Sequence, residues 1–177
     1  MLLLITVVIS IAGVHAQYDD NPLKQKKWFS VTAGVNNMDY LSWQGMGTFS
    51  MRGETVLTQF RLGYSQEIVK AADDSCTDRH NRLTEAGIMW GDGWSGKKWY
   101  VTGAAGFGLN VRMFCRHTLY ENQYITAVTL GIPFQTEFGV LFTDRFGMNI
   151  IGTANWNFRA PYIGGSIGAF WRLKKKK

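Results

Sequence analysis

The chain has 177 residues with a formal net charge of +6, 20 glycines, three prolines, two cysteines and 14% aromatic residues. Four of the positive charges are consecutive lysines at 174–177, which we predict to form a solvated basic tail. The other Lys and Arg residues are scattered, whereas nucleic-acid binding requires a clustered basic surface with interleaved aromatic residues. We therefore expect no nucleic-acid partner.

The first 16 residues are apolar and end in Val14-His15-Ala16, which suits the cleavage site of a signal peptidase. The polar segment that begins at Gln17 would start the mature chain. A transmembrane anchor is the alternative, but an apolar run of about 15 residues is shorter than the roughly 20 that a spanning helix needs. We predict a signal peptide over 1–16 and export from the cytoplasm.

Eight segments alternate apolar with small or polar residues, the period of a β-strand. In the first, Phe29 and Val31 lie on one face and Ser30 and Thr32 on the other. The predicted strands cover 27–36, 41–51, 55–68, 82–91, 98–113, 124–142, 146–157 and 162–173. With no linker or internal repeat between them, they predict one all-β domain over 27–173.

The segment 124–142 holds this alternation for 19 positions, with bulky residues at most even positions and small or polar residues at most odd ones. A strand of a soluble protein usually has 5–6 residues, whereas a membrane-spanning strand needs about 9–11 and can project further. The pattern predicts an eight-stranded antiparallel up-and-down transmembrane β-barrel, with lipid on one face and a polar lumen on the other. Pro133 removes a backbone donor and suggests a bulge.

The connections differ in length, and outer-membrane barrels have short periplasmic turns and longer outer loops. With the segment 17–26 in the periplasm, the predicted periplasmic turns are 52–54, 92–97 and 143–145. The predicted outer loops are 37–40, 69–81, 114–123 and 158–161. Under this topology the two longest loops both face outward.

Aromatic residues gather near both ends of the predicted strands, as expected for the girdles at the two membrane interfaces. We place Trp90, Trp99, Phe142 and Trp171 in the periplasmic girdle, and Tyr64 and Trp156 in the outer one. The partner predicted from this arrangement is the lipid of the membrane.

Cys76 and Cys115 are the only cysteines, and they fall in the two longest predicted loops. In an exported protein an even pair favours a disulfide, which would close a loop of about 40 residues and stabilise the fold by roughly 3–4 kcal/mol. Two thiolates with His80 and His117 could instead form a zinc site. The spacing between Cys115 and His117 is tight for zinc, and we favour the disulfide.

The polar face of the strands predicts a network of side chains inside the barrel. Its members are Gln59, Arg61, Glu85, Arg112, Gln135, Glu137 and Arg172. An unpaired buried charge is costly, so we expect structural ion pairs that fill the lumen. The alternative is a narrow pore.

The segment Gly164-Gly-Ser-Ile-Gly168 matches the G-x-S-x-G pattern of hydrolase nucleophiles. That pattern requires a strand–turn–helix and a later histidine, and no histidine follows Gly168. These small residues instead fit the inward face of the last strand. We predict no catalytic residues, no cofactor and no metal site.

The chain resembles the small eight-stranded outer-membrane β-barrel family, which includes OmpX and the OmpA membrane domain. The resemblance rests on 134–142, the short turn 143–145 and the final strand 163–173. It implies an integral outer-membrane protein of a diderm bacterium without enzymatic activity, with a structural role or a surface ligand held by loops 69–81 and 114–123. The alternative is a secreted lipocalin-like barrel that binds an apolar ligand, although the polar inner face would make a poor apolar pocket.

Overall fold

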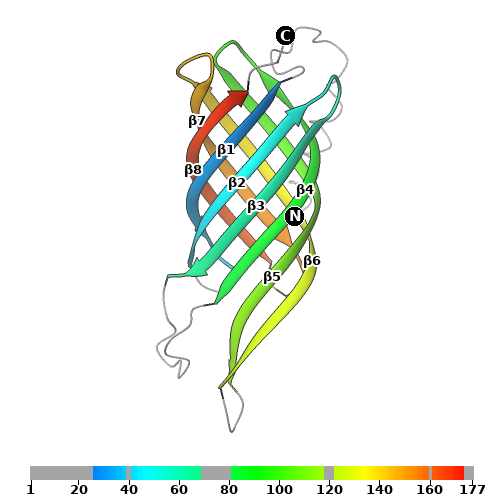
Figure 1. The fold of residues 1–177 in the computed structure, drawn as a ribbon, viewed down its shortest axis with the longest axis vertical. Helices are drawn as coiled ribbons and strands as arrows, with labels where there is room; N and C mark the ends of the chain where they lie inside the picture. The colour runs from blue at the N-terminus through cyan, green and yellow to red at the C-terminus, as the bar shows by residue number, and fades with distance from the viewer. Residues whose placement is uncertain (1–25, 39–40, 69–80, 118–121, 160, 174–177) are drawn as a thin grey trace.

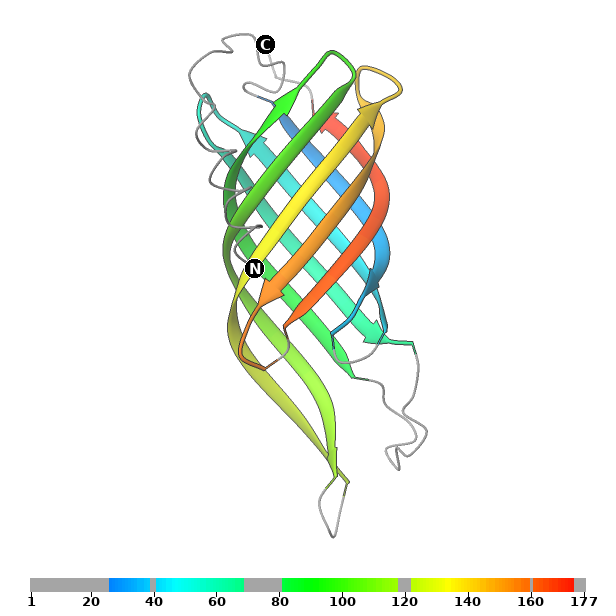
Figure 2. The same cartoon turned by 180° about the vertical axis from the view of Figure 1, so that it is seen from behind.

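A computed structural model describes residues 26–38, 41–68, 81–117, 122–159 and 161–173. Eight antiparallel strands form one closed barrel, in which consecutive strands pair and the last strand returns to the first (Figures 1 and 2). The strands are β1 (Lys27–Asn36), β2 (Ser42–Arg52), β3 (Leu57–Glu67), β4 (Arg82–Ser95), β5 (Trp99–His117), β6 (Asn122–Leu141), β7 (Phe146–Trp156) and β8 (Tyr162–Leu173). The predicted fold class is confirmed.

The two ends of the barrel differ. One end carries the connections 53–56, 96–98 and 142–145 and residues 27 and 173; we call it the turn end, and it lies at the top of Figure 1. The opposite end, which we call the loop end, carries 37–41, 68–81, 118–121 and 157–161. Among the described residues, no helix is long and apolar enough to cross a membrane.

The alternation in the sequence becomes an alternation between lumen and exterior. Along β1, Trp28, Ser30 and Thr32 are buried, while Phe29 and Val31 are exposed. Ile151, the one large apolar residue on the otherwise polar face of its strand, is also buried in the lumen. The large exposed side chains are therefore apolar, which is the inverse of a water-soluble barrel.

The barrel closes where β1 pairs with β8, from Lys27↔Leu173 to Asn36↔Gly164. Two glycines let these strands approach closely: a Cβ atom on Gly34 would overlap the Gly165 carbonyl oxygen, and one on Gly168 would overlap that of Val31. Glycine is required at both positions because the neighbouring backbone occupies the space of a side chain.

Two strands continue beyond the ranges predicted from the alternation. β4 extends to Ser95 and β5 begins at Trp99, so the connection expected at 92–97 is shorter and lies at 96–98. The loop expected at 114–123 is shorter than predicted, because 114–117 pairs with 122–125 as the end of the β5–β6 hairpin and leaves 118–121 as the connection. Backbone pairing can continue past the apolar outer wall, where the alternation is lost, and the alternation therefore underestimates these strands.

Pro133 interrupts the ladder without the bulge that the sequence suggested. Pairing between β5 and β6 stops after Ala105↔Phe134 and resumes at Gly108↔Gly131 in the same register. No extra residue is inserted. The missing donor of proline is therefore accommodated by a local gap in the ladder rather than by a shift.

Replacing Phe107 with arginine tests whether the outer wall faces lipid. The Phe107 side chain is 67% exposed near the middle of β5. We expect Phe107→Arg to lower the free energy of unfolding in lipid vesicles by about 2–4 kcal/mol, because a charge at the bilayer midplane is poorly solvated. Phe142→Arg, at a belt position, should cost only about 0–1 kcal/mol. Equal effects of the two substitutions in denaturant titrations would contradict a lipid-facing wall.

Candidate functional site

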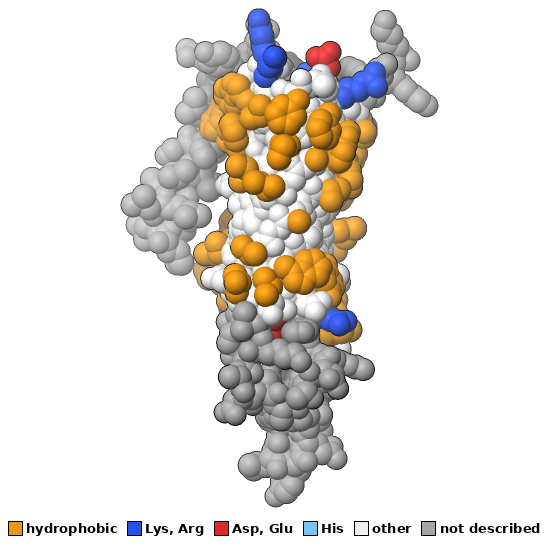
Figure 3. Space-filling view, turned by 90° about the vertical axis from the view of Figure 1, so that its left-hand side faces the viewer, with side chains coloured by type: hydrophobic (Ala, Val, Ile, Leu, Met, Phe, Trp, Pro, Cys, Tyr) orange, Lys and Arg blue, Asp and Glu red, His pale blue; other side chains and the backbone are white. Residues whose placement is uncertain are grey.

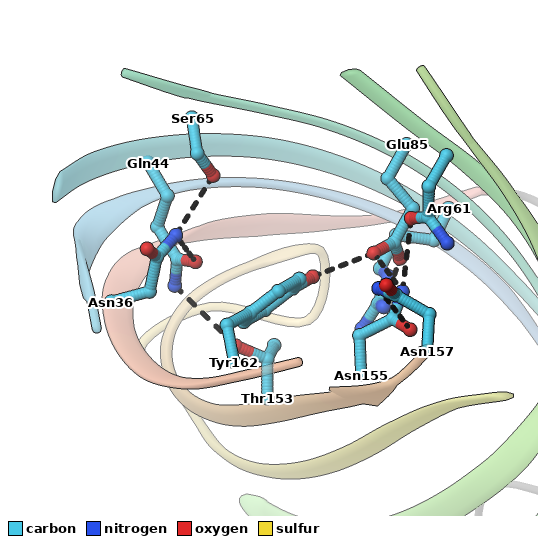
Figure 4. Close-up of polar contacts among 10 residues, drawn as sticks. Asn36, Gln44, Arg61, Ser65, Glu85, Thr153, Asn155, Asn157 and Tyr162 are labelled. Atoms are coloured by element: carbon cyan, nitrogen blue, oxygen red, sulfur yellow. Dashed lines mark hydrogen bonds and ion pairs between the residues drawn. The ribbon is translucent and has the colours of Figure 1, made fainter. Parts of the chain in front are cut away.

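The lumen is the candidate site, because all eight strands direct buried polar side chains into it. Its best-connected member is Glu85 on β4, which is 2% exposed. Glu85 forms an ion pair with Arg61 on β3, which is 1% exposed, and accepts hydrogen bonds from Asn155 Nδ2 and, at 2.7 Å, from Tyr162 Oη (Figure 4). Three strands besides β4 thus contribute donors to one carboxylate, and its charge is compensated inside the barrel.

A second group of uncharged side chains lies toward the closing seam (Figure 4). Asn36 Nδ2 donates to Gln44 Oε1 at 3.0 Å and to Ser65 Oγ at 2.8 Å. Gln44 Nε2 in turn donates to Ser166 Oγ at 3.0 Å. These contacts join β1, β2, β3 and β8 across the lumen and support the seam where the first and last strands meet.

The turn end of the lumen holds a mixed polar and aromatic group. Glu137 accepts hydrogen bonds from Tyr100 Oη and, at 2.6 Å, from Asn149 Nδ2. The Tyr100 ring lies 5.5 Å from Trp28 and 5.0 Å from Phe170 between ring centroids. We call the buried apolar cluster at this end the plug; its members are Trp28, Leu57, Tyr100, Leu141 and Phe170.

Two glycines make room for these lumen side chains. A Cβ atom on Gly139 would overlap the Tyr100 ring, which lies over that position of β6. A Cβ atom on Gly131 would collide with the side-chain amides of Asn155 and Asn110. The small residues on the inner face of β6 are therefore complements of large side chains on neighbouring strands.

The remaining predicted lumen residues make fewer contacts. Gln59 Nε2 donates to Ser50 Oγ at 3.1 Å, and Gln135 is buried. Arg112 lies toward the loop end, where Nη1 donates to the Arg159 carbonyl oxygen at 2.8 Å and the guanidinium lies 5.0 Å from the centroid of the Phe114 ring. Arg172 is half-buried at the turn end. These residues line the same lumen as the Glu85 group.

The predicted girdle residues lie on the exterior. Trp90, Trp99, Phe142, Trp171 and Trp156 are exposed, and Tyr64 is half-exposed. Rings stack at both ends: Phe146 lies 5.4 Å from Trp171, and Trp43 lies 5.3 Å from Tyr64. On the face shown in Figure 3, hydrophobic side chains gather in two bands with a paler band between them.

Several solved structures share this eight-stranded barrel architecture. The Neisserial surface protein A matches with a TM-score of 0.59 and 10% identity, over 85% of this chain and 96% of that one. Ail of Yersinia pestis, in complex with the heparin analogue sucrose octasulfate, matches with a TM-score of 0.57 and 8% identity, over 84% and 97%. The N-terminal barrel domain of Pseudomonas aeruginosa OprF matches with a TM-score of 0.54 and 10% identity, over 85% and 98%.

No protein-family model matches the sequence, and no curated protein matches it at a significant level. The assignment of the fold therefore rests on the likeness to solved structures. The chain has the fold of the small eight-stranded outer-membrane barrels.

The structure does not describe the side chain of either cysteine. Cys76 and His80 lie outside the described residues, as do the side chains of Cys115 and His117. The disulfide and the alternative zinc site therefore stay predictions. Within the described part of the chain, no three His, Cys, Asp or Glu side chains come close enough to hold a metal ion.

The lumen network predicted from the sequence includes Glu137, which lies beside the plug, but none of the plug residues. Trp28, Tyr100 and Phe170 have the same parity along their strands as the polar lumen residues. That parity is the signal that identifies them as inward. The predicted network considered only polar residues of the inner face. It therefore omitted the large aromatic side chains at the turn end of the lumen.

Proposed function

We propose that this protein is an integral barrel of the bacterial outer membrane, without enzymatic activity, whose lumen is filled and whose loop end makes surface contacts. The turn end would face the periplasm. The exposed apolar wall, the two aromatic bands and the fold of the outer-membrane neighbours support insertion in the membrane. The plug and the Glu85 group support a filled lumen, because both place contacting side chains across it.

The proposed surface role is supported by the ribbon that the ends of β5 and β6 form. This ribbon projects past the rest of the barrel (Figures 1 and 2). β6 pairs with β5 from Asn122 onward, but its pairing with β7 begins only at Ile132. Over 122–131, no described segment pairs with the second edge of β6. The backbone donors and acceptors along that edge are available to an incoming strand.

The open edge lacks the features that normally prevent such pairing. Natural edge strands are shortened or carry lysine, proline or a bulge. The segment 122–131 contains no charged residue and no proline, and it includes exposed Val128 and Leu130, which are 61% and 77% accessible. We propose that the ligand is an extended polypeptide segment that pairs with β6 through its backbone, rather than a polyanion of the kind present in the Ail structure.

The test uses the barrel in lipid nanodiscs and an array of uncharged ten-residue peptides rich in Val, Ile and Thr. We expect a subset to bind the wild type, with affinity that changes little with salt. Thr126→Lys with Val128→Lys should weaken that binding at least about tenfold, because lysines on an edge oppose strand addition. The control is Arg82→Lys, a substitution at an exposed position of the loop end that lies away from this edge.

Protection of backbone amides supplies the second readout. On peptide binding, the amides of 122–131 that do not bond to β5 should exchange more slowly with deuterated solvent. Peptide binding that is unaffected by the two edge lysines, or that protects amides elsewhere only, would contradict the proposed edge.

A further inference from the structure

Basic side chains surround the turn end of the barrel. Lys27, Lys97, Lys98 and Arg145 are exposed there, and Lys26 is half-buried beside them. The space-filling view shows Lys and Arg side chains at this end, beyond the hydrophobic band (Figure 3). We call these five residues the basic collar.

Carboxylates at the same end do not balance the basic collar. Asp92 forms an ion pair with Arg52, and both side chains are largely buried. The exposed carboxylates of the described turn end are Glu54 and Asp144, against the four exposed cations of the collar. The turn end is therefore a site of uncompensated positive charge.

The aromatic girdle fixes the depth of the collar relative to the membrane. Lys98 directly precedes Trp99, and Arg145 lies in the turn between Phe142 and Phe146, whose rings are 6.3 Å apart. Aromatic girdles lie at the level of the lipid headgroups. Cations adjacent to the girdle are thus at the level of the phosphate groups, where each basic side chain attracts an anionic surface.

We propose that the basic collar binds anionic phospholipid headgroups in the leaflet that surrounds the turn end. The charges are complementary, because a ring of exposed ammonium and guanidinium groups faces phosphates that carry a net negative charge. This inference rests on the proposed insertion in a membrane and goes beyond it by naming the class of lipid that is selected.

The test measures lipid selectivity in reconstituted vesicles with spin-labelled lipids. The full-length barrel is placed in phosphatidylcholine, and the fraction of motionally restricted label is compared for phosphatidylglycerol and phosphatidylcholine probes. The collar variant combines Lys27→Gln, Lys97→Gln, Lys98→Gln and Arg145→Gln. Its matched control is Arg82→Gln with Arg159→Gln, two exposed cations at the loop end.

We expect the wild type to favour phosphatidylglycerol about fivefold at low salt, and the preference to weaken as salt is added. The collar variant should lose most of this preference, and the loop-end control should keep it. The four lysines at 174–177 remain in every variant, so a preference that survives the collar variant would overturn the collar as its source. Equal association of both lipids with the wild type would also overturn it. If neither probe shows a motionally restricted fraction, the membrane insertion itself would be refuted.

Discussion

Replacing Glu85 with leucine is expected to lower the free energy of unfolding by about 3–5 kcal/mol. Glu85 is the acceptor for Arg61, Asn155 and Tyr162, and its removal leaves the Arg61 guanidinium buried without its counter-charge. A buried charge that has lost its partner cannot recover its hydration, which is why removing one member of such a pair costs more than the pair contributes.

The double variant Arg61→Met with Glu85→Leu separates this effect from a loss of packing. Both charges are then gone, and stability should recover to within about 1–2 kcal/mol of the wild type. Unfolding by denaturant in lipid vesicles, followed by tryptophan fluorescence, measures both variants. If the double variant is as unstable as the single one, the buried charge is not the cause.

Removing two rings of the plug is expected to open the turn end of the lumen. Tyr100 and Phe170 stack edge-to-face and both are buried, so Tyr100→Ala with Phe170→Ala deletes the centre of the apolar cluster. Truncation of a buried aromatic side chain to alanine costs about 3–5 kcal/mol and leaves a cavity in a closely packed interior. The cavity here lies along the axis of the barrel, where water and ions could enter.

Single-channel recording in planar bilayers measures the opening. The wild type should show no discrete conductance steps, and the double variant should show them. Phe146→Ala is the control, since Phe146 stacks on Trp171 and has the parity of the outer wall. Conductance in the wild type equal to that of the double variant would favour the narrow pore over a filled lumen.

The positions of the strands could be predicted because the apolar outer wall and the polar lumen impose opposite requirements on successive residues. β1 and β8 occupy the ranges expected from their alternation, and β6 begins and ends within two residues of its expected bounds. This signal fails where the apolar outer wall ends. β5 continues through Arg116 to His117, where the sequence offers no apolar face to follow.

The contacts inside the lumen could not be predicted in the same way. Parity places Glu85 and Tyr162 inside the barrel, but they are 77 positions apart in sequence. Whether they meet depends on the stagger of all eight strands, which sets the height of each inward residue. The sequence therefore predicts which residues enter the lumen, and only the three-dimensional register tells which of them touch.

The most direct test of a lipid-facing barrel is the gel mobility of the mature chain after refolding in detergent, with and without boiling. A closed barrel whose apolar wall binds detergent should resist SDS and change mobility only after heating, with circular dichroism typical of β-structure before heating. Reductant in parallel lanes would also test the Cys76–Cys115 bond. A chain that shows no heat-dependent shift and folds in plain buffer would contradict the membrane assignment and favour a soluble ligand-binding barrel.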